Sequence, residues 1–160
     1  KTLFIDGNHD GKLFQKTGIH FGEQLANLRD DLKYIGDSYA NIDLGNFDID
    51  IVHPSGGTPY TMGYRAQTWL RNKTDKEKAD LTIFGHLHQM LDGKTEGSHI
   101  LYAGAFQGQT PYINRKGIDT NAGFHMLDVY CNDEGIEHIV IHRYDYDLEK
   151  VSEVDIDEIL

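Results

Sequence analysis

The sequence predicts an α/β protein in which mixed β-sheets are flanked by helices. Short runs of apolar, β-favouring residues recur along the chain, and each is followed by glycine or polar residues, as buried strands are. Two other segments carry apolar residues at helical spacing. Beyond residue 98 the strand-like pattern returns without a further helical pattern. Strands that alternate with helices, followed by strands alone, are consistent with layered sheets and helices.

In the N-terminal half, each expected element follows from its local pattern. Residues 2–6 are short and apolar, which indicates a buried strand. Gly7 and Asn8 interrupt the strand and should begin a loop that carries His9 and Asp10. The further elements expected here are a helix at 22–33, short strands at 34–36 and 39–44, a strand at 47–52 and a helix at 64–72.

The C-terminal half is expected to consist of strands and one long connection. The strands are expected at 81–84, 98–103, 123–130 and 135–143. Residues 104–122 show no periodicity, and a loop of this length in a compact domain is usually functional or disordered. We expect one domain over residues 1–144, followed by an acidic tail over 145–160.

Composition places the chain among globular proteins and limits its partners. Its 160 residues, 39% hydrophobic and 26% charged, have the size and balance of one folded domain. No run is long enough to cross a membrane, no secretory signal is visible, and the single Cys131 excludes an internal disulfide framework. These features favour a cytoplasmic protein without a membrane partner.

The net charge of −11 repels polyanions, so a nucleic acid could bind only through metal ions and a local basic patch. Two stretches offer such a patch, but solvated charge on a helix face and on a loop is the favoured explanation for them. They are Arg65, Arg71 and Lys73 in one, and Arg115 and Lys116 in the other.

Three short pieces of sequence place candidate metal ligands directly after expected strands. They are Gly7-Asn8-His9-Asp10, then His53, then Gly85-His86-Leu87-His88. Taken singly, each has an ordinary explanation, because Asn, Asp and Gly are common in turns and a histidine after a strand is often a surface residue. Taken together, they bring ligands from three strand ends to one rim, which is where open α/β sheets build their sites.

The chemistry of these side chains favours divalent transition metals. Asn and His offer neutral oxygen and nitrogen donors, which suit Mn, Fe, Zn or Co. The remaining histidines lie in polar or alternating stretches and are expected to be surface or strand residues: His20, His99, His125, His138 and His142.

In this order, the three pieces resemble the C-terminal half of the motif set of the calcineurin-like metallophosphoesterases. The resemblance implies a metal site with two divalent ions, one held by Asn8, His53 and His86 and the other by His88. His9 would not be a ligand; it would face the phosphate and protonate the leaving oxygen. The implied reaction is hydrolysis of a phosphoester by a metal-bridged hydroxide that attacks phosphorus.

The resemblance covers residues 3–144 and implies one half of a four-layer αββα sandwich. The earlier motifs of the family, Asp-x-His and Gly-Asp-x-x-Asp, are not found in the sequence. We therefore expect the chain to be part of a domain whose N-terminal half is missing, and to be inactive or a poor enzyme alone. The alternative is a non-catalytic subunit or scaffold of the same fold.

The substrate class is suggested by a looser resemblance. Residues 103–112 are similar to segments of phosphoesterases from phage and archaeal DNA metabolism, which favours a phosphodiesterase or nuclease. Tyr112 and Arg115 could then contact a nucleotide or nucleic acid, although both are also ordinary loop residues.

Overall fold

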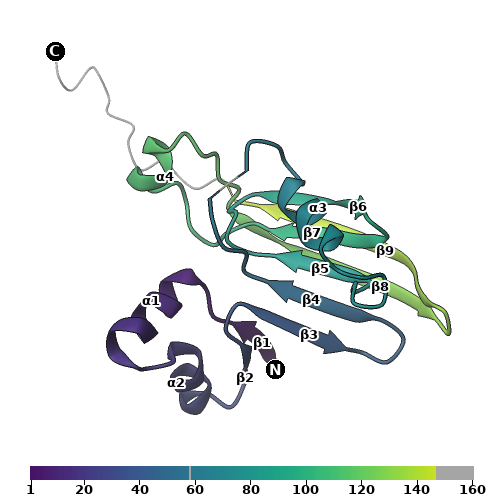
Figure 1. Cartoon of the computed structure of the whole chain (residues 1–160), viewed down its shortest axis with the longest axis horizontal. Coiled ribbons are helices and arrows are strands. Elements are labelled where there is room, and N and C mark those ends of the chain that lie inside the picture. The colour runs from purple at the N-terminus through teal and green to yellow at the C-terminus, as the bar shows by residue number, and fades with distance from the viewer. Residues whose placement is uncertain (58, 147–160) are drawn as a thin grey trace.

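The computed structural model describes residues 1–57 and 59–146, and these residues form three sheets with helices beside them. The mixed α/β class predicted from the sequence is confirmed. Figure 1 shows a small N-terminal unit beside a larger sheet, with a long hairpin behind that sheet. The expected acidic tail begins inside the last strand, at Asp145, and its residues 147–160 lie outside the described part.

The N-terminal unit is a parallel pair of strands linked by two helices. Its elements are β1 (Thr2–Ile5), α1 (Asn8–Thr17), α2 (Phe21–Leu28) and β2 (Leu32–Gly36). The prediction of a loop after β1 is wrong, because Asn8, His9 and Asp10 form the first turn of α1. The Asp10 carboxylate accepts a hydrogen bond from the Gly7 amide at 2.8 Å, and such a cap favours helix formation.

The helix expected at 22–33 is also too long. The structure ends α2 at Leu28, and Leu32 and Lys33 already belong to β2. Parallel pairing of Leu32 with Thr2 and of Lys33 with Leu3 explains the difference. Pairing with a distant strand outweighs the local helical spacing of the leucines.

The central sheet has five strands in the order β3-β4-β5-β7-β6. They are β3 (Tyr39–Asp43), β4 (Asp48–Val52), β5 (Leu81–Phe84), β6 (Met90–Thr95) and β7 (Ser98–Ala103). Strands β4 and β5 run parallel with Val52 opposite Phe84. The residues that follow them, His53 and Gly85-His86, therefore emerge next to each other at one edge of the sheet.

Helix α3 (Tyr64–Arg71) covers one face of this sheet, as Figure 1 shows. Its Ala66 and Leu70 are fully buried and belong to one core cluster with Val52, Phe84 and Tyr102. The Tyr102 hydroxyl accepts a hydrogen bond from the Ala66 amide at 3.3 Å. The core thus lies directly beneath the strand ends that carry His53 and His86.

One charged pair is buried just beyond the C-terminal end of α3. Asp50 is 0% exposed, and its carboxylate lies 2.5 Å from the Lys73 amine. Tyr39 and Asn41 also donate hydrogen bonds to this carboxylate, at 2.8 and 3.0 Å. Burial disfavours the charged amine, but the hydrogen bond and the charge of Asp50 outweigh it and raise the pKa of Lys73.

The C-terminal part is a hairpin and a short helix. The hairpin consists of β8 (Gly123–Asn132) and β9 (Gly135–Asp145), and it extends beyond the strands expected from the sequence. The segment expected as an aperiodic loop contains α4 (Pro111–Arg115), which is capped by the Thr110 hydroxyl at 3.3 Å from the Ile113 amide. Among the described residues, no helix has the length and apolar character needed to span a membrane.

Candidate metal centre

The structure brings Asn8, His53 and His86 into direct contact. His53 Nε2 lies 2.9 Å from Asn8 Oδ1 and 3.1 Å from His86 Nδ1. Ligands held about 2.1 Å from a metal ion are separated by about 3 Å when they are neighbours in octahedral geometry. His53 is therefore spaced from each of its two neighbours as adjacent ligands of one divalent ion are, and the donor types fit such an ion.

The backbone around Asn8 leaves room for the His53 ring. A side chain on Gly7 would place its Cβ 2.8 Å from the Cε1 atom of His53, which is closer than such atoms approach in proteins. Gly7 thus allows the ring to lie against the end of β1. The glycine of the Gly-Asn-His-Asp piece has a packing role as well as a role in ending the strand.

His86 is oriented by a second contact. Its Nε2–H donates to the Gly56 carbonyl at 2.5 Å, so Nδ1 carries no proton in the neutral ring and points to His53. The neighbouring carbonyl of Gly57 accepts a hydrogen bond from Arg65 at 3.0 Å. A carbonyl that holds the outer ring nitrogen is the usual support of a histidine that ligates a metal.

The Gly-His-Leu-His turn carries unusual backbone conformations. His86 has a φ of 68° and His88 a φ of 55°, a region that residues other than glycine, Asn and Asp seldom adopt. Such conformations cost on the order of 1–3 kcal/mol and cluster at functional sites. The turn therefore presents both histidines at the cost of local strain.

His88 does not join the other three residues. Its Nδ1 is buried and has no hydrogen-bond partner among the described residues, while its carbonyl accepts from the Asn121 amide at 2.8 Å. A buried nitrogen without a partner is rare in native structures. An ion at this nitrogen would satisfy it, which agrees with the ligand role that the family resemblance implies for His88.

His9 lies next to Asn8 in the first turn of α1 and is exposed. No hydrogen bond holds its ring within the described part of the chain. Its charge contributes to the lowered pKa values of His53 and His88, so it lies near both histidines. This position is compatible with a group that acts on a substrate and does not ligate the ion.

Burial is the main cause that lowers the pKa of both His53 and His88. The charge of His86 lowers both further, and Asp10 opposes this effect at His53 only. These two rings are therefore neutral near pH 7, the form that binds metal ions without competition from a proton.

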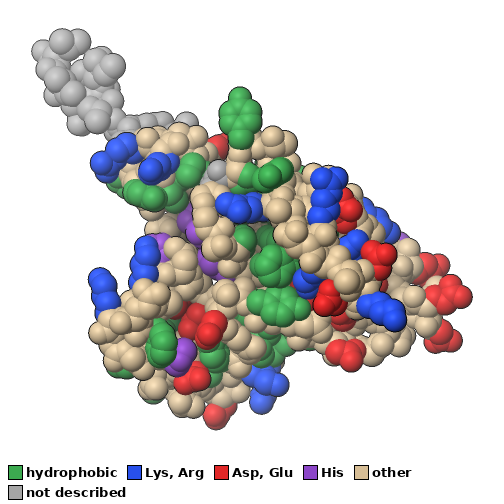
Figure 2. All heavy atoms as spheres, viewed as in Figure 1, with side chains coloured by type: hydrophobic (Ala, Val, Ile, Leu, Met, Phe, Trp, Pro, Cys, Tyr) green, Lys and Arg blue, Asp and Glu red, His purple; other side chains and the backbone are tan. Residues whose placement is uncertain are grey.

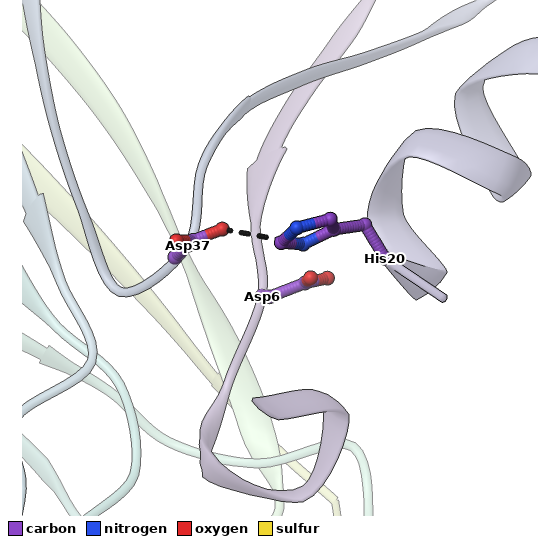
Figure 3. A group of neighbouring side chains, drawn as sticks. All are labelled: Asp6, His20 and Asp37. Atoms are coloured by element: carbon purple, nitrogen blue, oxygen red, sulfur yellow. Dashed lines mark ion pairs between the residues drawn. The ribbon is translucent and has the colours of Figure 1, made fainter. Parts of the chain in front are cut away.

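A second cluster was missed by the sequence reasoning. His20 was expected at the surface, but it lies beside Asp6 and Asp37, with ligand atoms of all three within 4.8 Å of one another. Figure 3 shows the three side chains close together, with His20 and Asp37 directed toward each other and Asp6 beside the His20 ring. They come from the end of β1, the residue before α2 and the turn after β2, and no short motif links them. One pocket of about 520 Å³ is lined by this cluster and by Asn8 and His53.

The comparisons with known proteins identify the fold. The chain is similar to an archaeal phosphodiesterase, with a TM-score of 0.53 and 13% identity over 89% of this chain and 68% of that one. It is also similar to wild-type Vps29 of Entamoeba histolytica complexed with Zn²⁺, with a TM-score of 0.47 and 15% identity over 90% and 82%. A predicted phosphoesterase of Streptococcus pneumoniae gives a TM-score of 0.48 and 10% identity over 90% and 97%.

No protein-family model matches the chain, and no curated protein gives a significant sequence match. The likeness to the archaeal phosphodiesterase supports the fold that the motifs predicted: the chain has the calcineurin-like metallophosphoesterase fold. At this level of identity, the likeness concerns the fold alone. Because one fold hosts many functions, the reaction has to be argued from the site.

Proposed function

We propose that this protein is a metal-dependent phosphoester hydrolase of the phosphodiesterase type. The observation that supports the proposal best is the convergence of Asn8 Oδ1, His53 Nε2 and His86 Nδ1 within 2.9 and 3.1 Å contacts. These residues would hold one divalent ion, and His88 would contribute to a second. The proposed ions are drawn from Mn, Fe, Zn and Co.

Bound divalent ions would neutralise phosphate oxygens and lower the pKa of a coordinated water. The chain's own contribution is to position the substrate and to move a proton. His9 is proposed to donate its proton to the leaving oxygen, for which its exposure beside Asn8 gives access. Arg65 holds the loop whose Gly56 carbonyl orients His86.

The proposed centre is incomplete within these 160 residues. The family's carboxylate motifs are not in the sequence, so His88 would be nearly alone at the second ion. We propose that the missing N-terminal half of the domain supplies these carboxylates. This incompleteness is also what favours the second candidate, a non-catalytic subunit that keeps a single ion for structural reasons.

The substrate is proposed to be a nucleotide or nucleic-acid phosphodiester. Tyr112 on α4 is 65% exposed, and the Lys116 amine lies 5.9 Å from the centre of its ring, so an aromatic face and a cation lie together. Arg71 and Lys73 are engaged in ion pairs with Glu96 and Asp50, which makes them poor phosphate ligands. Helix α4 is thus a better candidate for substrate contact than α3.

Metal binding tests the proposal directly. Calorimetric titration of the folded chain with Zn²⁺ or Mn²⁺ at pH 7.5 should show binding that His86→Ala weakens at least about tenfold, because a ligand is lost. Binding should also fade below about pH 6, where imidazoles take up protons. His142→Ala is a matched control, since that histidine pairs with Asp128 on the exposed hairpin. Equal affinity in the wild type and His86→Ala would contradict the assignment.

A turnover assay separates the two candidate functions. Hydrolysis of bis(p-nitrophenyl) phosphate with added metal is expected for the enzyme once its carboxylate ligands are present. Metal binding without turnover, even when the N-terminal half is supplied, would favour the non-catalytic subunit.

A further inference from the structure

Asn8, His53 and His86 are called the histidine group below. Asp6, His20 and Asp37 form a second cluster of possible metal ligands, and it shares no residue with that group. Their ligand atoms lie within 4.8 Å of one another, and His20 Nδ1 is 3.7 Å from Asp37 Oδ1. That separation is too long for a hydrogen bond. It fits two ligands that are each about 2.1 Å from one ion and subtend an angle of about 120° there. Figure 3 shows the dashed contact between His20 and Asp37, with the Asp6 carboxylate beside the His20 ring.

Each of the three side chains is held by a neighbour outside the cluster. The His20 ring stacks on Phe14, with ring centres 3.9 Å apart and planes inclined by 25°. Tyr34 donates a short hydrogen bond to the Asp37 carboxylate. Such supporting contacts orient ligands in metal sites and reduce the entropy that binding costs.

Gly22, in the first turn of α2, keeps the third ligand in place. A Cβ on Gly22 would lie 2.6 Å from Asp6 Oδ1, so the missing side chain lets the carboxylate lie against the helix. Three side chains from three separate elements are therefore fixed around one point.

The charge of the cluster favours a cation. Asp6 is only 6% exposed, and no lysine or arginine within residues 1–57 and 59–146 forms an ion pair with it. Asp10 and Asp37 add negative charge around it. Burial is the main cause that raises the pKa of Asp6, and a buried carboxylate stays charged only where a cation or a metal ion compensates it. His20 is the one imidazole in this group, and alone it does not balance two carboxylates.

We propose that Asp6, His20 and Asp37 bind a divalent cation in addition to the one assigned to Asn8, His53 and His86. Two carboxylates and one imidazole combine the ligands preferred by Mn²⁺ with one preferred by Zn²⁺ and Fe²⁺. Because the pocket of about 520 Å³ is lined by this cluster and also by Asn8 and His53, the two ions would share one recess. Figure 2 shows histidine side chains in the hollow between the lower-left part of the molecule and the rest. The site is an addition to the proposed function and does not depend on it.

Counting bound Mn²⁺ tests the proposal. The signal of free Mn²⁺ in electron paramagnetic resonance gives the number of ions bound by the chain at pH 7.5. The wild type should bind two, because His88 alone is not expected to hold a third ion in the isolated chain. His20→Gln and Asp37→Asn should each bind one fewer, or bind it at least about tenfold more weakly. Asp37 is 75% exposed, so its replacement should preserve the fold, which circular dichroism checks.

Two further variants separate failure of this proposal from failure of the histidine group: His138→Gln as a matched control, and His53→Gln. His138→Gln removes another imidazole stacked on an aromatic ring, Tyr130, and should bind as many ions as the wild type. Wild-type numbers and affinities in both His20→Gln and Asp37→Asn would overturn the proposal and leave an ordinary ion pair. If the histidine group does not bind an ion but the Asp6 cluster does, His53→Gln will bind as many ions as the wild type. His20→Gln will still bind one ion fewer.

Discussion

His53 is the central residue of the candidate metal centre, because its Nε2 touches the donor atoms of both Asn8 and His86. The sequence predicted that strand ends would bring these three residues together, and the structure does so. Their roles as ligands stay predictions. His88 and His20 show where sequence reasoning fails. The orientation of His88 depends on strained backbone, and the neighbours of His20 lie on elements that only the fold brings close.

The contact between Gly7 and the His53 ring gives a sharp prediction. Gly7→Ala should displace the ring from Asn8 and lower metal affinity by about 10–100-fold, the usual effect of disturbing the support of a ligand. Gly11→Ala is the matched control, since a Cβ there meets nothing within 4 Å. Calorimetric titration with Zn²⁺ measures both. Unchanged affinity in Gly7→Ala would mean that His53 is not held by this packing.

His9 allows binding to be separated from chemistry. In a form of the protein that hydrolyses phosphoesters, His9→Asn should leave metal content intact and lower kcat by about 10²–10⁴-fold, the range for loss of a general acid. The loss should be smaller for p-nitrophenyl esters, whose leaving groups need little protonation.

This difference is tested by measuring the metal content of each variant and its rate on two substrates, one with a good leaving group and one with a poor one. His53→Ala is the comparison, because removal of a ligand should lower metal content and activity together. If His9→Asn lost metal as His53→Ala does, with equal rate losses on both substrates, His9 would have to be a ligand.

At the scale of elements, the sequence predicted strands that end in site residues better than it predicted helices. The strand at 81–84 is confirmed as β5, because its residues are apolar and β-favouring and a Gly turn follows. Strand β6 was missed, since Met90–Thr95 contains glycine and charged residues. It forms through antiparallel pairing with β7, and strand preference depends strongly on such context.

The buried pair of Asp50 and Lys73 gives a prediction about how α3 is anchored to the sheet. Lys73→Met should lower the free energy of unfolding by about 3 kcal/mol, the lower end of the range for breaking a buried pair, because Tyr39 and Asn41 still bond Asp50. Urea unfolding measures it. The double variant with Asp50→Asn should recover most of the loss, since no buried charge remains.

Lys78→Met is the control for this experiment. Lys78 pairs with Asp75, whose side chain is 96% exposed, and such surface pairs contribute about 0–1 kcal/mol. If Lys73→Met cost no more than Lys78→Met, the buried pair would not anchor α3.

For the whole molecule, the α/β class and the family resemblance were predicted from the sequence, because the motifs and the strand pattern are local. The division into a small parallel pair, a five-stranded sheet and a hairpin was not, because it depends on which distant strands pair. The lengths of β8 and β9 likewise come from pairing with each other over their full extent.

The buried histidines predict how stability depends on pH. Burial lowers the pKa of His125 from its ordinary value of 6.5, Arg143 lowers it further, and Asp92 and Asp145 oppose this. The unfolded chain therefore binds protons more readily than the folded one. Stability is full above pH 6.5 and decreases as the pH falls through this value toward the lowered pKa.

Urea unfolding in the presence of a chelator at pH 7.5 and 5.5 measures this loss. His125→Phe should reduce the difference between the two pH values, because one buried imidazole is removed. His138→Phe, at an exposed position, should leave the difference as it is in the wild type. An equal pH dependence in all three proteins would show that His125 plays no part.

The three donor atoms at the candidate metal centre come from two separate sheets. Asn8 follows β1 of the parallel pair, whereas His53 and His86 follow β4 and β5 of the five-stranded sheet. An ion held by all three would cross-link the two bodies, so its occupancy and their docking would be one equilibrium. At an ion concentration of about 100 times Kd, mass action would add about 2.7 kcal/mol to the docked state.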